Sequence, residues 1–302
     1  MNKILYNALL LFSVMAAFAQ QEPQYSQYQY NTMTINPGYT GSRGHLAAIS
    51  LYRNQWAGIE GAPRTITFGL DTPVGYSSGL GLSIIQDDLG PASETFIDGN
   101  YSHILYLSNT DRLALGIKAG VRFFSLDWSR GIHRDPEAVF NENISGQLTP
   151  TVGTGVFYYS PKAYIGLSTP NVLQTTFYDE FQEIQTNERT HLYFIGGYVF
   201  DINPFLKFKP STFIKQTFGA PISIDLSTNF LMNDKLTLGL NYRWDESLGG
   251  LLGFEVNSQF NIGYAYDFSI NNLGNYNSGT HEVFIRYRYR SNPKILKSPR
   301  FF

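Results

Sequence analysis

The sequence contains no cysteine, and only 15% of its 302 residues are charged. The absence of cysteine excludes disulfide scaffolds, thiolate zinc sites, iron–sulfur clusters, cysteine nucleophiles and a lipidated N-terminal cysteine. A net charge of -2 provides no basic field for nucleic acid. Disorder is also disfavoured, because it requires more charge and fewer aromatic residues than the 16% found here.

Long hydrophobic runs are also lacking beyond the N-terminus, where no segment approaches the roughly 18 apolar residues of a membrane-spanning helix. The mean hydropathy of -0.18 excludes a protein made of many membrane-spanning helices. It does not exclude a membrane β-barrel, whose strands are apolar on one face only.

The N-terminus has the pattern of a signal peptide. Lys3 provides the positive region, residues 8–18 provide the apolar region, and Ala17-Phe18-Ala19 is an A-x-A cleavage site before Gln20. We therefore expect residues 1–19 to be removed on export; the alternative is an N-terminal anchor helix.

The rest of the chain alternates with a period of two. In residues 235–245, Leu236, Leu238 and Leu240 fall on one face, and polar or small residues fall on the other. Successive side chains of a strand point to opposite faces, so this pattern predicts strands with one apolar and one polar face. No sustained helical periodicity competes outside the signal peptide.

The alternation predicts an all-β fold of about fourteen antiparallel strands. We place them near residues 46–56, 64–71, 79–86, 94–106, 112–126, 148–159, 161–169, 189–201, 204–217, 221–231, 234–245, 248–257, 259–270 and 280–290. Long connections (127–147, 170–188 and 271–279) alternate with tight turns, as in an outer-membrane barrel with short periplasmic turns and longer extracellular loops.

A soluble β-sandwich is the alternative, because its strands alternate too. Strand length, aromatic residues near the strand ends and an export signal without disulfides favour the transmembrane barrel. The aromatic residues are expected largely in a lipid-facing band. The expected organisation is a signal peptide (1–19), a periplasmic N-terminal segment or plug (20–45), the barrel (46–290) and a periplasmic C-terminal tail (291–302).

The polar faces of the strands carry charges of both signs, which a barrel would place in its lumen. The predicted lumen charges are Asp225, Arg243, Glu255, Asp267, Glu282, Arg286 and Arg288, with further basic residues at Lys118, Arg122, Lys207, Lys209, Lys215 and Arg290. Asp267 is a candidate to pair with the strand that carries Arg286 and Arg288. A paired interior is favoured over an electrostatic filter for a solute, because both signs occur.

Motifs for catalysis are scarce, and no cofactor, metal site or enzymatic activity is expected. Residues 75–79 match G-x-S-x-G, but this nucleophile motif requires a turn from strand to helix. Here the motif follows Asp71-Thr72-Pro73 in a predicted hairpin, where glycine serves the turn. The five histidines are too dispersed to suggest metal binding.

Two segments near the N-terminus are richer than a barrel requires. One is polar and aromatic and precedes the first strand (24–42); the other spans the first predicted hairpin (52–65). A plug and a hairpin anchor are one interpretation, and partner docking is the other. The candidate partner-binding residues, chosen by location, are Tyr25, Tyr28, Asn36, Pro37, Arg53, Trp56, Glu60 and Arg64. Four of these residues, Arg53, Trp56, Glu60 and Arg64, could also form a paired cluster at the extracellular rim or inside the lumen.

The same segments resemble the PorP/SprF family. The resemblance is carried by Gln24–Tyr28, Ile35–Gly41, Tyr52–Trp56, Gly61–Thr65, Asp88–Pro91, Ser278–Glu282 and Ser298–Phe302. It covers essentially the whole exported chain and departs at Gly38, where alanine is expected.

The resemblance implies a non-enzymatic barrel, integral to the outer membrane of a Bacteroidetes-type bacterium, that serves type IX secretion and gliding motility. The implied partners are secretion components and a secreted adhesin or its C-terminal domain, which the barrel exports or holds at the cell surface. A basic tail (Lys294, Lys297, Arg300) and a periplasmic N-terminal segment would face the machinery. A solute-conducting porin or uptake barrel is the alternative function.

Overall fold

The computed structural model describes residues 26–130, 143–173, 176–177, 186–187, 190–217 and 219–289. The predicted signal peptide, Tyr25, Arg290 and the predicted tail lie outside these ranges. No helix among the described residues is long and apolar enough to cross a membrane.

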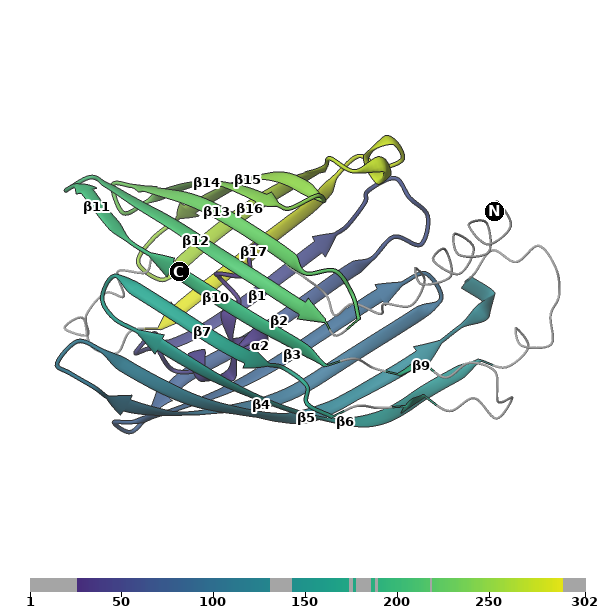
Figure 1. The fold of residues 1–302 in the computed structure, drawn as a ribbon, viewed down its shortest axis with the longest axis horizontal. Helices are drawn as coiled ribbons and strands as arrows, with labels where there is room; N and C mark the ends of the chain where they lie inside the picture. The colour runs from purple at the N-terminus through teal and green to yellow at the C-terminus, as the bar shows by residue number, and fades with distance from the viewer. Residues whose placement is uncertain are drawn as a thin grey trace, which may run out of the picture.

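The described chain forms one antiparallel sheet that closes on itself (Figure 1). Its strands are β1 (Leu46–Asn54), β2 (Arg64–Val74), β3 (Ser78–Leu89), β4 (Ala92–Tyr106), β5 (Arg112–Leu126), β6 (Ile144–Tyr159), β7 (Ala163–Thr169), β10 (His191–Tyr198), β11 (Phe200–Asn203), β12 (Leu206–Thr217), β13 (Ser223–Met232), β14 (Leu236–Arg243), β15 (Ser247–Glu255), β16 (Phe260–Ser269) and β17 (Thr280–Tyr289).

Two pairings close the barrel. The first and last strands meet, with Leu46 of β1 opposite Tyr289 of β17. β10 pairs with β7 on one side and with β12 on the other, and β11 continues the line of β10 beyond Val199. β10 and β11 therefore act as one wall strand, and the structure is a closed barrel of 14 strands. This confirms the predicted fold, with strand ends shifted by a few residues.

The two ends of the barrel differ in their connections. At the short-turn end, strands are joined through residues 75–77, 107–111, 160–162, 204–205, 233–235 and 256–259. At the long-loop end they are joined through 55–63, 90–91, 127–143, 170–190, 218–222, 244–246 and 270–279. Connections 90–91 and 244–246 are tight turns among the longer loops. The connection 170–190 also contains a small two-stranded ladder, β8 (Thr176–Phe177) with β9 (Thr186–Asn187).

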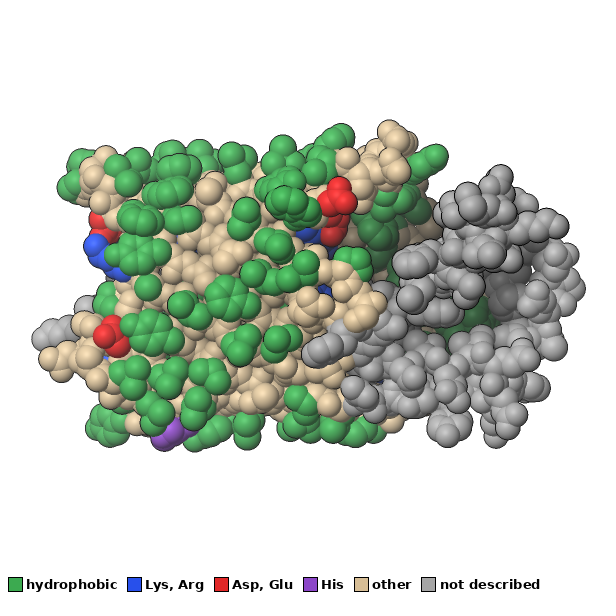
Figure 2. Space-filling view, viewed as in Figure 1, with side chains coloured by type: hydrophobic (Ala, Val, Ile, Leu, Met, Phe, Trp, Pro, Cys, Tyr) green, Lys and Arg blue, Asp and Glu red, His purple; other side chains and the backbone are tan. Residues whose placement is uncertain are grey.

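The alternation of the sequence becomes the inside and outside of the barrel. In β14, Thr237, Asn241 and Arg243 are buried, whereas Leu238 and Leu240 are exposed. Most other wall strands follow the same rule, although all four residues of β11 are exposed, and apolar side chains are spread over the face of the barrel seen in Figure 2. An apolar exterior around a polar interior is the reverse of a soluble fold and suits a barrel surrounded by lipid.

The lumen is occupied by the chain itself. Residues 26–45, here called the plug, lie inside the barrel, and all except Gly44 are buried. The plug contains the short helix α2 (Thr32–Ile35) and the 3-10 turn η1 (Pro37–Tyr39), and Figure 1 shows α2 within the ring of strands. The described part of the segment predicted as a periplasmic segment or plug (20–45) therefore takes the position of a plug rather than lying exposed below the barrel.

The plug and the wall share an apolar core inside the lumen. It contains Tyr28, Tyr30, Met33, Ile35 and Tyr39 of the plug, and Phe157, Tyr164, Tyr193, Phe213 and Phe284 among the wall residues. Many other aromatic side chains, such as Tyr101 and Phe268, are exposed on the wall, in line with the expected lipid-facing band. Some rings face inward, because the plug offers apolar surface there to bury.

Candidate functional site

Several buried polar contacts come together where the plug meets the seam between β1 and β17. Arg53 of β1 lies opposite Glu282 of β17, and their side chains form a buried ion pair. Glu282 also accepts hydrogen bonds from the backbone N–H groups of Ser26 (2.8 Å) and Gln27 (3.0 Å). One carboxylate therefore joins the first strand, the last strand and the plug.

A second carboxylate completes this seam cluster, which consists of Ser26, Gln27, Arg53, Asp267 and Glu282. Asp267 lies 3.7 Å from the Arg53 guanidinium and accepts a hydrogen bond from the Ser26 hydroxyl. The cluster is buried, with Glu282 0% and Arg53 3% exposed. Removing one member of such a pair would leave an uncompensated charge, which typically costs about 3–5 kcal/mol.

Other lumen charges are paired along the wall. Arg243 donates to Asp225 (2.8 Å), which lies opposite it on β13, and to Glu246 (2.9 Å) beyond the end of β14. Lys118 lies 3.2 Å from Asp98 on the neighbouring strand. Lys207 is less buried and pairs with Asp234 (2.7 Å) at the short-turn end. Both signs thus meet within hydrogen-bonding reach on adjacent strands.

The prediction that Asp267 pairs with Arg286 and Arg288 of β17 is wrong, because these residues lie at different heights on the two strands. Asp267 lies opposite Thr280, whereas Arg286 lies opposite Asn261, which precedes Asp267 by six residues in β16. This separation is about 20 Å at 3.3 Å per residue. Glu255 of β15 is the actual partner: it binds Arg288 and lies 3.6 Å from Arg286.

The plug is seated on the wall through close backbone contact. The Asn36 side chain accepts from the Gly38 N–H (2.9 Å) and donates to the Val156 carbonyl of β6 (3.1 Å). A Cβ at Gly116 of β5 would overlap the backbone of Gly38, so only glycine fits there. A Cβ at Gly38 would in turn lie 3.0 Å from the Ala114 carbonyl oxygen. The alanine expected at position 38 would therefore require these neighbours to shift by a few tenths of an ångström.

Aromatic pairs hold the plug along its length. Tyr28 stacks on Phe213 (centroid distance 5.0 Å) and Tyr30 stacks on Phe284 (4.2 Å). The ring of Tyr39 meets Phe157 edge-on at 5.2 Å. Such pairs contribute about 0.5–1.5 kcal/mol each beyond the burial of their area. The plug is therefore fastened by charge at the seam and by rings across the lumen.

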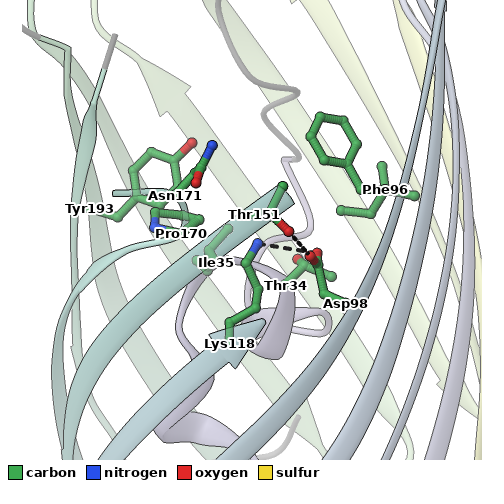
Figure 3. A pocket seen from close by; sticks show the side chains of 10 residues that line it. Thr34, Ile35, Phe96, Asp98, Lys118, Thr151, Pro170, Asn171 and Tyr193 are labelled. Carbon is green, nitrogen blue, oxygen red and sulfur yellow. Dashed lines mark hydrogen bonds and ion pairs between the residues drawn. The ribbon is translucent and has the colours of Figure 1, made fainter. Parts of the chain in front are cut away.

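A small crevice of about 30 Å³ lies between the plug and the wall (Figure 3). The Thr151 hydroxyl donates to Asp98 (2.7 Å), and Lys118 points to the same carboxylate. Thr34 and Ile35 of the plug form its floor together with wall residues. Because Asp98 and Lys118 form an ion pair with each other, we interpret the crevice as a packing gap between plug and wall rather than as a binding site.

Catalytic and metal chemistry find little support in the described part of the chain. No group of three or more His, Cys, Asp or Glu residues there could hold a metal ion. The G-x-S-x-G segment joins β2 to β3, and Gly75 has a φ of 62°. This confirms a strand–turn–strand context, in which the segment is not a nucleophile elbow.

The candidate partner-binding residues separate into two groups. Tyr28, Asn36, Pro37 and Arg53 are buried, and their described contacts are with the barrel itself. Glu60 and Arg64 are exposed and Trp56 is half-buried, at the long-loop end. No described ion pair joins Arg53, Glu60 and Arg64, so the four residues do not form the proposed paired cluster. Tyr25 lies outside the described residues.

The loop that carries Trp56 and Glu60 is held by its neighbours. The Ala57 N–H donates to the Gly279 carbonyl (2.8 Å), and the Ser278 N–H donates to the Ala57 carbonyl (2.7 Å). Residues 55–63 and 270–279, here called the collar, therefore form one hydrogen-bonded surface at the long-loop end. Tyr276 is 76% exposed on this surface.

A closed barrel with an apolar exterior, a charge-paired lumen and an internal plug defines an integral outer-membrane β-barrel protein. The sequence matches the family model described as "Type IX secretion system membrane protein PorP/SprF" over residues 17–287. The chain therefore belongs to the PorP/SprF family, and this membership associates it with type IX secretion.

Solved structures similar to this chain are outer-membrane barrels and channels. The CymD monoaromatic hydrocarbon channel is 10% identical, with 91% of this chain and 96% of that chain covered and a TM-score of 0.50. Omp33 of Acinetobacter baumannii is 8% identical, with 81% and 98% covered and a TM-score of 0.46. At such identities the likeness concerns the fold alone. No curated protein matches the sequence.

Proposed function

We propose that this barrel is a non-enzymatic component of the type IX secretion and gliding machinery of a Bacteroidetes-type bacterium. In this role it supports the secretion or surface attachment of a partner protein such as an adhesin, by contact with the adhesin or its C-terminal domain. The observation that carries the proposal, besides the family, is that the lumen is filled by a fastened plug.

The filled lumen supports an interaction role over solute conduction. A porin requires a continuous aqueous path, whereas here Tyr28, Asn36 and Tyr39 of the plug are at most 1% exposed inside the barrel. The lumen charges also occur as pairs, such as Arg243 with Asp225, rather than as a ring of one sign. Such charges stabilise the interior and do not select an ion.

The collar supports an interaction role in a different way. Its backbone hydrogen bonds order the two loops before any partner arrives, which lowers the conformational cost of binding. Trp56 and Tyr276 provide aromatic surface of the kind that dominates protein interfaces, and Glu60 and Arg64 add charge beside it. We assign the partner contact to this end of the barrel.

Co-purification from the native membrane in mild detergent tests the proposal. A secreted adhesin or a secretion component is expected to accompany the wild-type barrel. The double variant Trp56→Ala, Tyr276→Ala should lose the adhesin, whereas Tyr76→Ala in the turn at the opposite end should retain it. Recovery of the barrel alone would contradict the assignment.

Planar-bilayer recording separates the proposal from the porin alternative. The purified barrel is expected to show no large, steady current, because the plug occupies its lumen. A steady ion-selective current that disappears in the Arg286→Gln, Arg288→Gln variant would favour the porin.

A further inference from the structure

One group of lumen charges departs from the one-to-one pairing seen along the wall. It consists of Arg43 of the plug with Asp71, Glu255, Arg286 and Arg288 of the wall, and is here called the arginine cluster. Arg43 pairs with Asp71 (2.6 Å). Glu255 is shared: it binds Arg288 and lies 3.6 Å from Arg286. Three guanidinium groups therefore meet two carboxylates, which leaves the cluster with one surplus positive charge.

The strand register brings the wall members of the cluster together near the short-turn end. Arg288 of β17 and Asp71 of β2 both lie opposite Ala47 of β1, one on each side of it. Ala47 has a small side chain, so it does not separate the charged groups that flank it. Arg286 lies two residues before Arg288 on the same inward face of β17.

The plug completes the cluster from inside the lumen. The Tyr30 carbonyl accepts a hydrogen bond from the Arg43 guanidinium (2.8 Å), and the Tyr30 ring lies 5.3 Å from the Arg286 guanidinium. The positive charges of Arg43 and Arg288 both act unfavourably on Arg286. Guanidinium groups from the plug and from the wall therefore converge beside one tyrosine.

The cluster also has buried donors without acceptors. Arg286 is 1% exposed, and within the described part of the chain its Nε and Nη1 atoms have no hydrogen-bond partner. The Nε atoms of Arg43 and Arg288 are buried and unpaired in the same way. A buried charge is costly unless it is both paired and hydrogen-bonded. An anion would meet both requirements, because it accepts hydrogen bonds and offsets charge.

The surplus contrasts with the surroundings of two other buried arginines. Arg53 lies beside two carboxylates at the seam, and Arg243 lies beside two at the end of β14. Glu282 of the seam is on the same strand as Arg286, but the four residues between them correspond to about 13 Å at 3.3 Å per residue. The seam carboxylates therefore make no contact with Arg286.

We propose that the arginine cluster binds a small oxyanion such as inorganic phosphate, held by the unpaired N–H groups of Arg286 and its neighbours. Guanidinium N–H groups match the geometry of phosphate oxygens and form short, charge-assisted hydrogen bonds with them. The position in the lumen, away from the lipid-facing wall, favours a free oxyanion over a lipid headgroup. The side chains of Arg288 and Glu255 are 14% and 20% exposed, which gives the anion access from solvent.

The bound anion has a structural consequence. Arg43 belongs to the plug and Arg286 to the wall, so an oxyanion between them joins the two parts. Because a ligand that binds only the folded state stabilises it, the anion should stabilise the plugged barrel.

Thermal unfolding of the purified barrel in detergent tests the proposal. Sodium phosphate is compared with sodium chloride at equal pH and ionic strength. Phosphate at ten times its half-saturating concentration should raise the midpoint by about 3–6 °C relative to chloride. An equal effect of chloride would overturn the proposal, because it would show a general effect of salt.

Two variants locate the effect. Arg286→Gln should abolish the phosphate shift; it leaves two guanidinium groups and two carboxylates in the cluster, so it is expected to fold without phosphate. Arg112→Gln is the matched control, because Arg112 also lies at the short-turn end but donates to the Ser108 carbonyl (2.8 Å). It should retain the shift. A shift retained in Arg286→Gln, or lost equally in both variants, would overturn the proposal.

Equilibrium dialysis against radiolabelled phosphate measures binding without unfolding. One phosphate per wild-type barrel is expected. No binding would overturn the proposal even if Arg286→Gln failed to fold. Neither readout requires a secretion partner, so the result is independent of the co-purification experiment.

Discussion

The seam cluster predicts how strongly the plug and the barrel closure depend on one carboxylate. In Glu282→Gln, the amide oxygen can still accept one backbone N–H, but the carboxylate nearest Arg53 is lost and only Asp267, at 3.7 Å, remains beside the guanidinium. Breaking a buried ion pair on one side costs about 3–5 kcal/mol. The retained hydrogen bond places the expected loss at the lower end, about 3 kcal/mol.

This loss is measurable as a shift in thermal unfolding. At about 2–4 °C per kcal/mol for large domains, Glu282→Gln should lower the midpoint by about 6–12 °C. Folded barrels resist SDS and migrate differently from the unfolded chain, so the folded fraction can be followed on gels after heating samples to a series of temperatures.

A matched variant controls for the loss of a carboxylate as such. Glu246 also pairs with an arginine, Arg243 at 2.9 Å, but its side chain is 39% exposed. Exposed pairs contribute about 0–1 kcal/mol, so Glu246→Gln should shift the midpoint by no more than about 4 °C. Equal shifts for the two variants would refute the argument that burial at the seam makes Glu282 important.

Two further predictions concern the plug seat and an exposed loop. Gly116→Ala should destabilise the barrel by about 1–3 kcal/mol in the same assay, because the added methyl overlaps the plug backbone, whereas Gly250→Ala, with open space around its Cβ, should have no such effect. A hydrogen bond from Ser129 lowers the pKa of Asp127 below its ordinary value of 3.8, so this carboxylate stabilises its loop above that value and the contribution is lost as the pH falls through the lowered pKa. Fluorescence of the adjacent Trp128 should report a transition there that Asp127→Asn lacks; an unchanged acid transition in the variant would contradict the assignment.

The wall of the barrel was predictable from the sequence because each strand carries its own evidence. In residues 235–245 the two faces can be read directly, and lipid outside with a polar lumen inside requires that alternation. Strand ends were less certain, because residues such as Ile144 and Ser145 belong to β6 although they precede the clear alternation. The residues of a turn do not determine how many residues of the adjoining strand extend beyond the membrane.

The position of the plug was not predictable in the same way. Its contacts join residues far apart in sequence, and local alternation carries no information about them. One signal was present: Phe284 lies between Glu282 and Arg286 on the polar face of β17, where water would not favour a ring. Phe157 and Phe213 are similarly placed on inward faces. Rings at inward positions indicate that something apolar fills the lumen, although not which part of the chain.

The seam cluster also has a consequence for assembly. Its hydrogen bonds connect residues separated by 256 positions for Ser26 and 229 for Arg53, nearly the full length of the described chain. Contacts of such high order form late, because all the intervening chain must first be brought together. The plug, near the start of the chain, can therefore form these contacts only after β17, the last strand, has joined the barrel. Until then Tyr30 lacks its ring partner Phe284, and Ser26 and Gln27 lack the Glu282 carboxylate, so the seam end of the plug is fastened only once β17 is in place.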